Sequence, residues 1–259
     1  VLAYFVVSNI NNDIEFNALE QKGNTYQRPL ENILQGVVDH QMAILGRSAG
    51  QNKDSALAGS ADAVNKGIAK LEEVNTALGV DLQFTDEGLQ KRGRAGKNAA
   101  LVKSAWGTIL QDVGKLPASG PVPDGLMKAY DTLVADIRTM ITHMGDTSNL
   151  ILDPDLAGSS MMDVTLLALP QTQDRLGKIS AFVNKLSQKD ELSQDDQVAL
   201  SVYASSLDDD IKRVTGSMET SFNEDSNFYG VNPTLLRLKP LISEYVNANM
   251  SVVKWLKDN

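Results

Sequence analysis

The side chains best suited to bind a ligand gather in residues 145–163, a stretch that we call the polar corner. It begins Gly-Asp-Thr-Ser-Asn-Leu-Ile-Leu-Asp-Pro-Asp, and its candidate ligand-binding residues are Asp146, Thr147, Ser148, Asn149, Asp153, Asp155 and Asp163. Their carboxylates, hydroxyls and amide can hydrogen-bond a small polar molecule. The same residue types favour caps and turns, because their side chains bond to nearby backbone groups. The polar corner is therefore either a recognition site or a capping turn between two helices.

Metal and catalytic chemistry have little support in this sequence. Asp153, Asp155 and Asp163 offer oxygen ligands for a hard cation, but their spacing fits no EF-hand loop. The chain has no cysteine, and neither His40 nor His143 follows a glutamate by three residues, as di-iron helical bundles require. We predict no catalytic residue, no metal and no cofactor, so this chain is not expected to be an enzyme.

The sequence has one cluster of basic residues, Lys91, Arg92, Arg94 and Lys97. Residues 91–98 resemble a phosphate-binding loop only superficially, because Lys91 and Asn98 replace the first glycine and the final Ser or Thr. The cluster is either a solvated surface or a docking place for a small anion. A net charge of −9 argues against nucleic acid, since phosphate binding relies on clustered Lys and Arg.

The chain opens with seven apolar residues, Val-Leu-Ala-Tyr-Phe-Val-Val. A membrane-spanning helix needs about 20 such residues. We interpret this run as the outer end of a span that precedes the chain, and the alternative is the first turn of a soluble helix. Because residue 1 is Val, we expect a fragment of a longer protein.

Apolar residues recur at three-and-four spacing through most of the chain, which predicts helices. Pro29 is expected to interrupt the first, over 8–45, and Pro170 to kink the one over 161–186. Gly145 is expected to end the helix over 127–144. Thr85 and Asn232 are expected to cap helix starts, and Ser193 with Asp196 resembles a capping box. Helices are also predicted from a cap near Asp54 or Ser55 to Leu78, and over 85–113, 198–222 and 235–256.

The last predicted helix has the most regular pattern, a heptad that includes Tyr245 and Val252. Asn249 occupies a core position of this heptad, where a polar residue selects register at a cost in stability. We therefore expect this to be the signalling helix, the element that slides or rotates between two packings.

The fold predicted from these patterns is all-α, a long antiparallel helical bundle. Two stacked helical modules would share its long helices, one combining residues 8–27 with the last helices and the other running from Leu30 to Met144. A single long bundle is the alternative. Residues 1–29 would form a membrane-proximal helix after a transmembrane segment, residues 30–231 the sensor bundle, and residues 232–259 the heptad helix that returns toward the membrane. Both chain ends would then point the same way.

Three stretches together resemble a known family of signalling proteins. They are residues 21–30 (Gln-Lys-Gly-Asn-Thr-Tyr-Gln-Arg-Pro-Leu), residues 145–155, and Met-Met-Asp at 161–163 leading to Leu169-Pro170. They are similar to the all-helical extracytoplasmic sensor region of bacterial transmembrane receptors, such as methyl-accepting chemotaxis proteins and sensor histidine kinases. The resemblance spans most of the chain.

This resemblance implies a ligand-sensing, signal-relaying domain in the periplasm, anchored to the inner membrane in the full-length protein. It also implies a homodimer and a small-molecule ligand, such as an organic acid or another small polar molecule. The alternative is a non-catalytic helical interaction or spacer module that binds a protein partner. A polar corner that lines a pocket would favour the first function, and one that lies flat on the surface would favour the second.

Overall fold

A computed structural model describes the chain except for residues 1, 118, 153–155, 225, 228–229 and 231. The described residues form helices and no strand, so the all-α prediction is confirmed for them. The helices are α1 (Leu2–Ser48), α2 (Asp54–Leu78), α3 (Asp86–Lys91), α4 (Ala99–Gly114), α5 (Asp124–Thr147), α6 (Leu156–Met162), α7 (Leu169–Leu186), α8 (Gln194–Glu224), α9 (Pro233–Leu236) and α10 (Leu238–Asp258). Two shorter turns are η1 (Leu150–Leu152), a 3-10 helix, and η2 (Asp163–Ala168), a π-helix.

The first helix, α1, passes through Pro29 without a break, so the predicted interruption there is wrong. A proline inside a helix costs about 3 kcal/mol. Tyr26, Leu30 and Ile33 are fully buried on either side of Pro29, and burying one such side chain contributes about 1.5–3 kcal/mol. Tertiary packing therefore outweighs the local cost of the proline.

Several predicted helix caps are confirmed because their geometry is local. The Thr85 hydroxyl accepts from the Gly88 amide at 3.1 Å, and the Asn232 side chain accepts from the Thr234 amide at 2.9 Å. Ser193 and Asp196 form a reciprocal capping box, because the Ser193 amide donates to Asp196 at 2.9 Å and the Asp196 amide donates to Ser193 at 3.2 Å. Each cap satisfies backbone groups that the first helical turn leaves unpaired.

In two regions that contain glycine, the helices end at other residues than predicted. Gly145 does not end its helix, since α5 continues to Thr147 and Asn149, with φ of 66°, takes the left-handed conformation instead. The single helix expected over 85–113 is broken into α3 and α4, because Gly93 and Gly96 have φ of 66° and 75°. The resulting loop carries Arg94 and Lys97 toward α5.

The predicted kink near Pro170 takes the form of a π-helical turn. Helices α6 and α7 are continuous with η2, which ends at Ala168, two residues before Pro170. Such turns contain one residue more than an α-helical turn and are frequent at functional sites. The continuous helix formed by α6, η2 and α7 is therefore locally wider at η2.

The bundle has two units with separate apolar cores. The first core joins helices α1 to α5 and includes Tyr26, Leu30, Leu71, Trp106, Tyr130 and Ile137. The second unit contains α6 to α10, with one cluster around Leu200, Leu207, Val253 and Leu256 and another around Val164, Val214 and Met218. Helix α7 packs against α1 and α5 on one side and against α8 on the other, so it joins the units.

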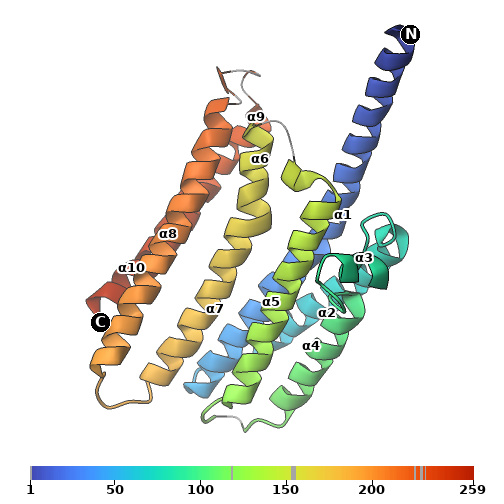
Figure 1. Cartoon of the computed structure of the whole chain (residues 1–259). Helices are drawn as coiled ribbons and strands as arrows, with labels where there is room; N and C mark the ends of the chain where they lie inside the picture. The colour runs from blue at the N-terminus through green and yellow to red at the C-terminus, as the bar shows by residue number, and fades with distance from the viewer. Residues whose placement is uncertain (1, 118, 153–155, 225, 228–229, 231) are drawn as a thin grey trace.

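The two units lie side by side in Figure 1, not one beyond the other along the helix axes as stacked modules would. Their composition also differs from the prediction for residues 8–27. Leu19 and Tyr26 pack in the first core, whereas α10 packs on α8. Helix α8 contributes to both apolar clusters of the second unit, with Leu207 in one and Val214 in the other.

The chain ends also depart from the expected arrangement. Figure 1 places the N-terminus and the C-terminus at opposite ends of the bundle. The long rods alternate in direction, so within the described residues α10 runs the same way as α1. The expectation that residues 232–259 return to the N-terminal end of α1 is therefore not met by this part of the chain. No helix in the described portion combines the length and apolar character that crossing a membrane requires.

The first core buries a polar group, His40. Its Nδ1 lies 2.6 Å from the Tyr130 hydroxyl, and its ring meets Trp106 edge-on. Burial, and to a smaller extent the charge of Arg47, lowers the pKa of His40 to about 4. His40 is therefore neutral in the folded chain at pH 7.

Because His40 is buried in its neutral form, we predict that the free energy of unfolding falls at acid pH, and that His40→Gln makes this fall smaller. The unfolded chain binds a proton at His40 near pH 6.5, whereas the folded chain binds one only near pH 4. Stability is therefore complete above about pH 6.5 and falls as the pH drops, by about 3 kcal/mol at pH 4. Urea unfolding at pH 7 and pH 4.5 measures this loss in both proteins. Equal losses in wild type and variant would contradict the assignment.

Candidate functional site

The described half of the polar corner is a helix junction. Asp146 forms an ion pair with Arg94 at 2.7 Å, and the Thr147 hydroxyl donates to the His143 carbonyl at 2.8 Å. Ser148 is fully buried. Asn149 supplies the left-handed residue that turns the chain after α5. These bonds fit the capping alternative for Asp146 through Asn149.

Helix α1 approaches the described part of this corner closely. A Cβ atom at Gly23 would lie 2.4 Å from the Ser148 Cβ, so α1 backbone touches the corner directly. Next to it, the Tyr26 and Phe84 rings stack at 4.3 Å between centroids. The corner therefore locks α1, α5 and the segment before α3 together.

His143 belongs to the same junction. Its Nε2 lies 3.1 Å from the Gln83 carbonyl oxygen and its Nδ1 lies 3.4 Å from Arg94 Nη1. Nε2 therefore donates and Nδ1 accepts, which is the neutral form. Burial lowers the pKa of His143, in agreement with that assignment.

In the predicted basic cluster, three of the four cations each pair with a different acidic residue. Arg94 pairs with Asp146, Lys97 with Asp136, and Lys91 with Glu87. Arg92 lies 3.4 Å from the Gln83 side-chain oxygen. The docking alternative requires charges that converge, whereas these pairs separate them, so this arrangement favours a structural role.

The remaining candidates of the corner are Asp153, Asp155 and Asp163. Asp153 and Asp155 lie outside the described residues. Asp163 begins the η2 turn and contacts α8, where it pairs with Arg213 and accepts from the Ser217 hydroxyl at 3.1 Å. Within the described part of the chain, no group of three or more His, Cys, Asp and Glu residues is placed to hold a metal ion.

Asn249 occupies the buried side of α10, 6% exposed. Its Nδ2 donates to the Tyr245 carbonyl of the same helix at 2.8 Å. The heptad prediction thus places it correctly at a core position. Its bond stays within α10 and does not cross to another helix.

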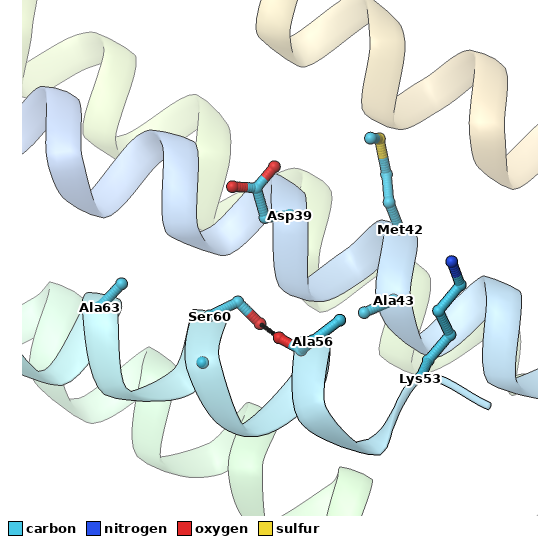
Figure 2. A pocket seen from close by; sticks show the side chains of 8 residues that line it. Asp39, Met42, Ala43, Lys53, Ala56, Ser60 and Ala63 are labelled. Atoms are coloured by element: carbon cyan, nitrogen blue, oxygen red, sulfur yellow. Dashed lines mark hydrogen bonds between the residues drawn. The ribbon is translucent and has the colours of Figure 1, made fainter.

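The groove in Figure 2, about 430 Å³, lies between α1 and α2. Its walls are mostly small side chains, among them Ala43, Ala56 and Ala63. The Ser60 hydroxyl bonds the Ala56 carbonyl at 2.7 Å. In Figure 2 the Asp39 carboxylate and the Lys53 ammonium group lie apart. The polar groups of this groove do not converge, so we assign it no ligand.

A second hollow, which we call the arginine hollow, lies where the two units meet. It holds about 400 Å³ and is lined by Ala135, Arg138, Thr139, Thr142, Leu166, Leu167, Gln171 and Arg213. These residues come from α5, η2, α7 and α8. Its volume lies within the range of about 300–1,000 Å³ of ligand pockets. It combines two cationic groups with hydroxyls and apolar walls, and no carboxylate lines it.

The two arginines of the arginine hollow are held differently. Arg138 donates to Asp174 and Gln171, and Asp174, 5% exposed, also pairs with Lys178 at 3.0 Å. Arg213 pairs with Asp163 across a more exposed contact, with side-chain exposures of 46% and 29%. The hydrogen bond between Arg213 and Asp163 raises the pKa of Arg213, so its guanidinium stays charged. Arg138 is therefore held by a nearly buried carboxylate, Asp174, whereas the partner of Arg213, Asp163, is accessible to water.

Sequence reasoning missed the arginine hollow. Its arginines are 75 positions apart in the chain, at 138 and 213, on helices predicted only from their apolar spacing. Of the eight lining residues none was a predicted candidate. The signal that could have pointed to this region was Pro170, seven positions after Asp163, since Asp163 begins the irregular turn and Pro170 follows its end.

The junction role of the corner predicts that Gly23→Ala destabilises the protein. The added Cβ would overlap Ser148 Cβ at 2.4 Å, so the backbone must shift, at a cost of about 1–3 kcal/mol. Gly216→Ala is the control, because a Cβ there meets nothing within 4 Å and should stabilise the helix by about 0.5–1 kcal/mol. Chemical denaturation measures both, and an equal effect of the two would refute the junction.

The buried position of Asn249 predicts that Asn249→Leu stabilises the second unit. Leucine removes a polar group from a core position and buries more apolar surface. The free energy of unfolding should therefore rise by roughly 1–3 kcal/mol. Asn247→Leu, at an exposed position of the same helix, is the matched control and should give no gain. Melting temperatures of the three proteins decide the matter. No difference between the two variants would mean that Asn249 is not a core position.

Comparisons with protein-family models, with curated proteins and with solved structures found no match. The chain's function is therefore argued from its own residues and their geometry.

Proposed function

We propose that this bundle is a ligand-sensing, signal-relaying domain of a bacterial transmembrane receptor, outside the cytoplasmic membrane, and that its ligand is a small carboxylate. The observation that carries the ligand proposal is the arginine hollow at the meeting of the two units. The receptor assignment is supported by the resemblance of residues 21–30, 145–155 and 161–163, with Leu169-Pro170, to the sensor regions of such receptors. Membrane anchoring and a homodimer are parts of this proposal.

The lining of the arginine hollow suits an organic acid. A guanidinium presents paired N–H groups that match the two oxygens of a carboxylate, and such charge-assisted bonds are among the strongest in proteins. Of the two arginines, Arg213 has the more exposed partner, so it is the guanidinium that a ligand carboxylate would contact. The Thr139 and Thr142 hydroxyls donate to backbone carbonyls at 2.9 and 3.1 Å, which leaves their oxygens free to accept from a ligand hydroxyl.

The position of the arginine hollow suits signal relay. Arg138 and Thr139 belong to α5 in the first unit, whereas Arg213 belongs to α8 in the second. A ligand that contacts both units binds better to one of their relative positions. It shifts the population of that arrangement by the difference in affinity. Since α10 packs on α8, any movement of α8 reaches α10.

A second candidate function is a non-catalytic interaction or spacer module. It is favoured by apolar side chains left at the surface of the second unit, with Val198 56%, Val202 59% and Trp255 46% exposed. Exposed apolar patches often mark protein contacts. The two functions differ in whether a small molecule stabilises the purified chain by itself.

The test is a thermal-shift and calorimetric screen with acetate, succinate and citrate, with succinamide as the uncharged control. A ligand that binds only the native state raises the melting temperature by mass action. Arg213→Gln should weaken binding about 10-fold or more, the cost of one charged hydrogen-bonding group. Lys212→Gln, the adjacent cation that pairs with Asp208, should leave binding unchanged. No shift with any of the three acids would reject the carboxylate proposal and favour the interaction module.

A further inference from the structure

Asp163 already occupies the arginine that the proposed ligand would use. Arg213 Nε donates to Asp163 Oδ2 at 3.1 Å, and Nη2 donates to Oδ1. The same Oδ2 accepts from the Ser217 hydroxyl at 3.1 Å. This is a forked arginine–carboxylate contact of the kind that a free carboxylate makes. The chain therefore supplies its own carboxylate to one cation of the arginine hollow.

The η2 turn, which Asp163 begins, also forms a wall of the arginine hollow. Leu166 and Leu167 of this turn line it. The turn is fastened to α8 through Asp163, and six residues earlier the Ala157 carbonyl accepts from the Ser221 hydroxyl at 2.9 Å. Residues Leu166 and Leu167 of η2 therefore line the arginine hollow, while its first residue, Asp163, is bound to α8.

The two carboxylate–arginine pairs near the arginine hollow differ in how easily they exchange. Asp174 is 5% exposed and is held by both Arg138 and Lys178, and breaking a buried pair is strongly unfavourable. Asp163 is 29% exposed and Arg213 46%, and exposed pairs contribute little because water competes for them. A ligand carboxylate would therefore displace Asp163 and leave Asp174 in place.

We propose that Asp163 is an internal competitor for the ligand, and that its displacement from Arg213 frees the η2 turn from α8. This inference rests on the proposed function, because it names the regulation of the same site. In the ligand-free state Asp163 holds Arg213 and ties η2 to α8. In the bound state the ligand holds Arg213, and η2 loses its charged contact with α8. Ligand binding is thereby converted into a change at the contact between α6–α7 and α8.

The test is Asp163→Asn, which keeps the size of the side chain and removes its charge. Affinities for acetate, succinate and citrate are measured by calorimetry, and amide hydrogen exchange is measured without ligand. We expect about three- to five-fold tighter binding of the acid that binds wild type, the factor that one exposed ion pair represents. We also expect faster exchange in residues 156–168, because their contact with α8 is weakened, and unchanged exchange in α2.

Asp208→Asn is the matched control, since it removes an ion pair of α8 with Lys212 and lies outside the lining of the arginine hollow. Its affinities and its exchange in residues 156–168 should equal those of wild type. Ser217→Ala is the milder second variant, for use if D163N does not fold. It removes one hydrogen bond to Asp163 and should tighten binding in the same direction by a smaller factor.

The outcomes separate the two proposals. An acid that binds wild type and D163N equally, or binds the variant more weakly, overturns the competitor and leaves the proposed function standing. Failure of all three acids to bind either protein overturns both. Tighter binding by D163N without faster exchange in residues 156–168 contradicts the release of η2. Tighter binding together with faster exchange there supports the whole inference.

Discussion

Burial of one face of α1 is the interaction on which the rest of the bundle depends. Leu30, Ile33 and Val37 have no exposed surface, and α2, α5 and α7 all pack against this helix. Gly36 and Gly67 allow α1 and α2 to approach closely, because a Cβ at either would lie 2.7 Å from a side chain of the other helix. Once α7 is seated on α1 and α5, its opposite side is available to α8, and the second unit follows from that placement.

Charges inside the bundle are neutralised in pairs between neighbouring helices. Asp136, Asp174 and Asp210, each less than 9% exposed, pair with Lys97, Arg138 and Arg175. A buried carboxylate is tolerated only with such a partner, so these pairs fix how the helices align. The contact of Asp163 with Arg213 is the more exposed exception. The proposed ligand binding centres on this pair because, of the two arginine–carboxylate pairs at the arginine hollow, it is the more exposed.

Local rules accounted for the helices better than for the turns between them. The apolar spacing predicted the long helices, and the caps at Thr85 and Asn232 formed as expected because each involves only its own first turn. Pro29 and Gly145 were misjudged because burial on both sides carried the helix through them. In both cases the packing of distant residues contributed more free energy than the local preference removed.

The sequence by itself determined that this chain is all-helical, where several of its helices begin, and that Asn249 is buried within its last long helix. Only the tertiary structure decided that α10 runs parallel to α1 and that Asp163 meets an arginine 50 positions away. It also decided that the arginine hollow forms between two units. Periodicity and capping are properties of neighbouring residues, so one sequence reveals them. The pairing of helices depends on which apolar faces bury most surface together, and that choice is made by the whole chain.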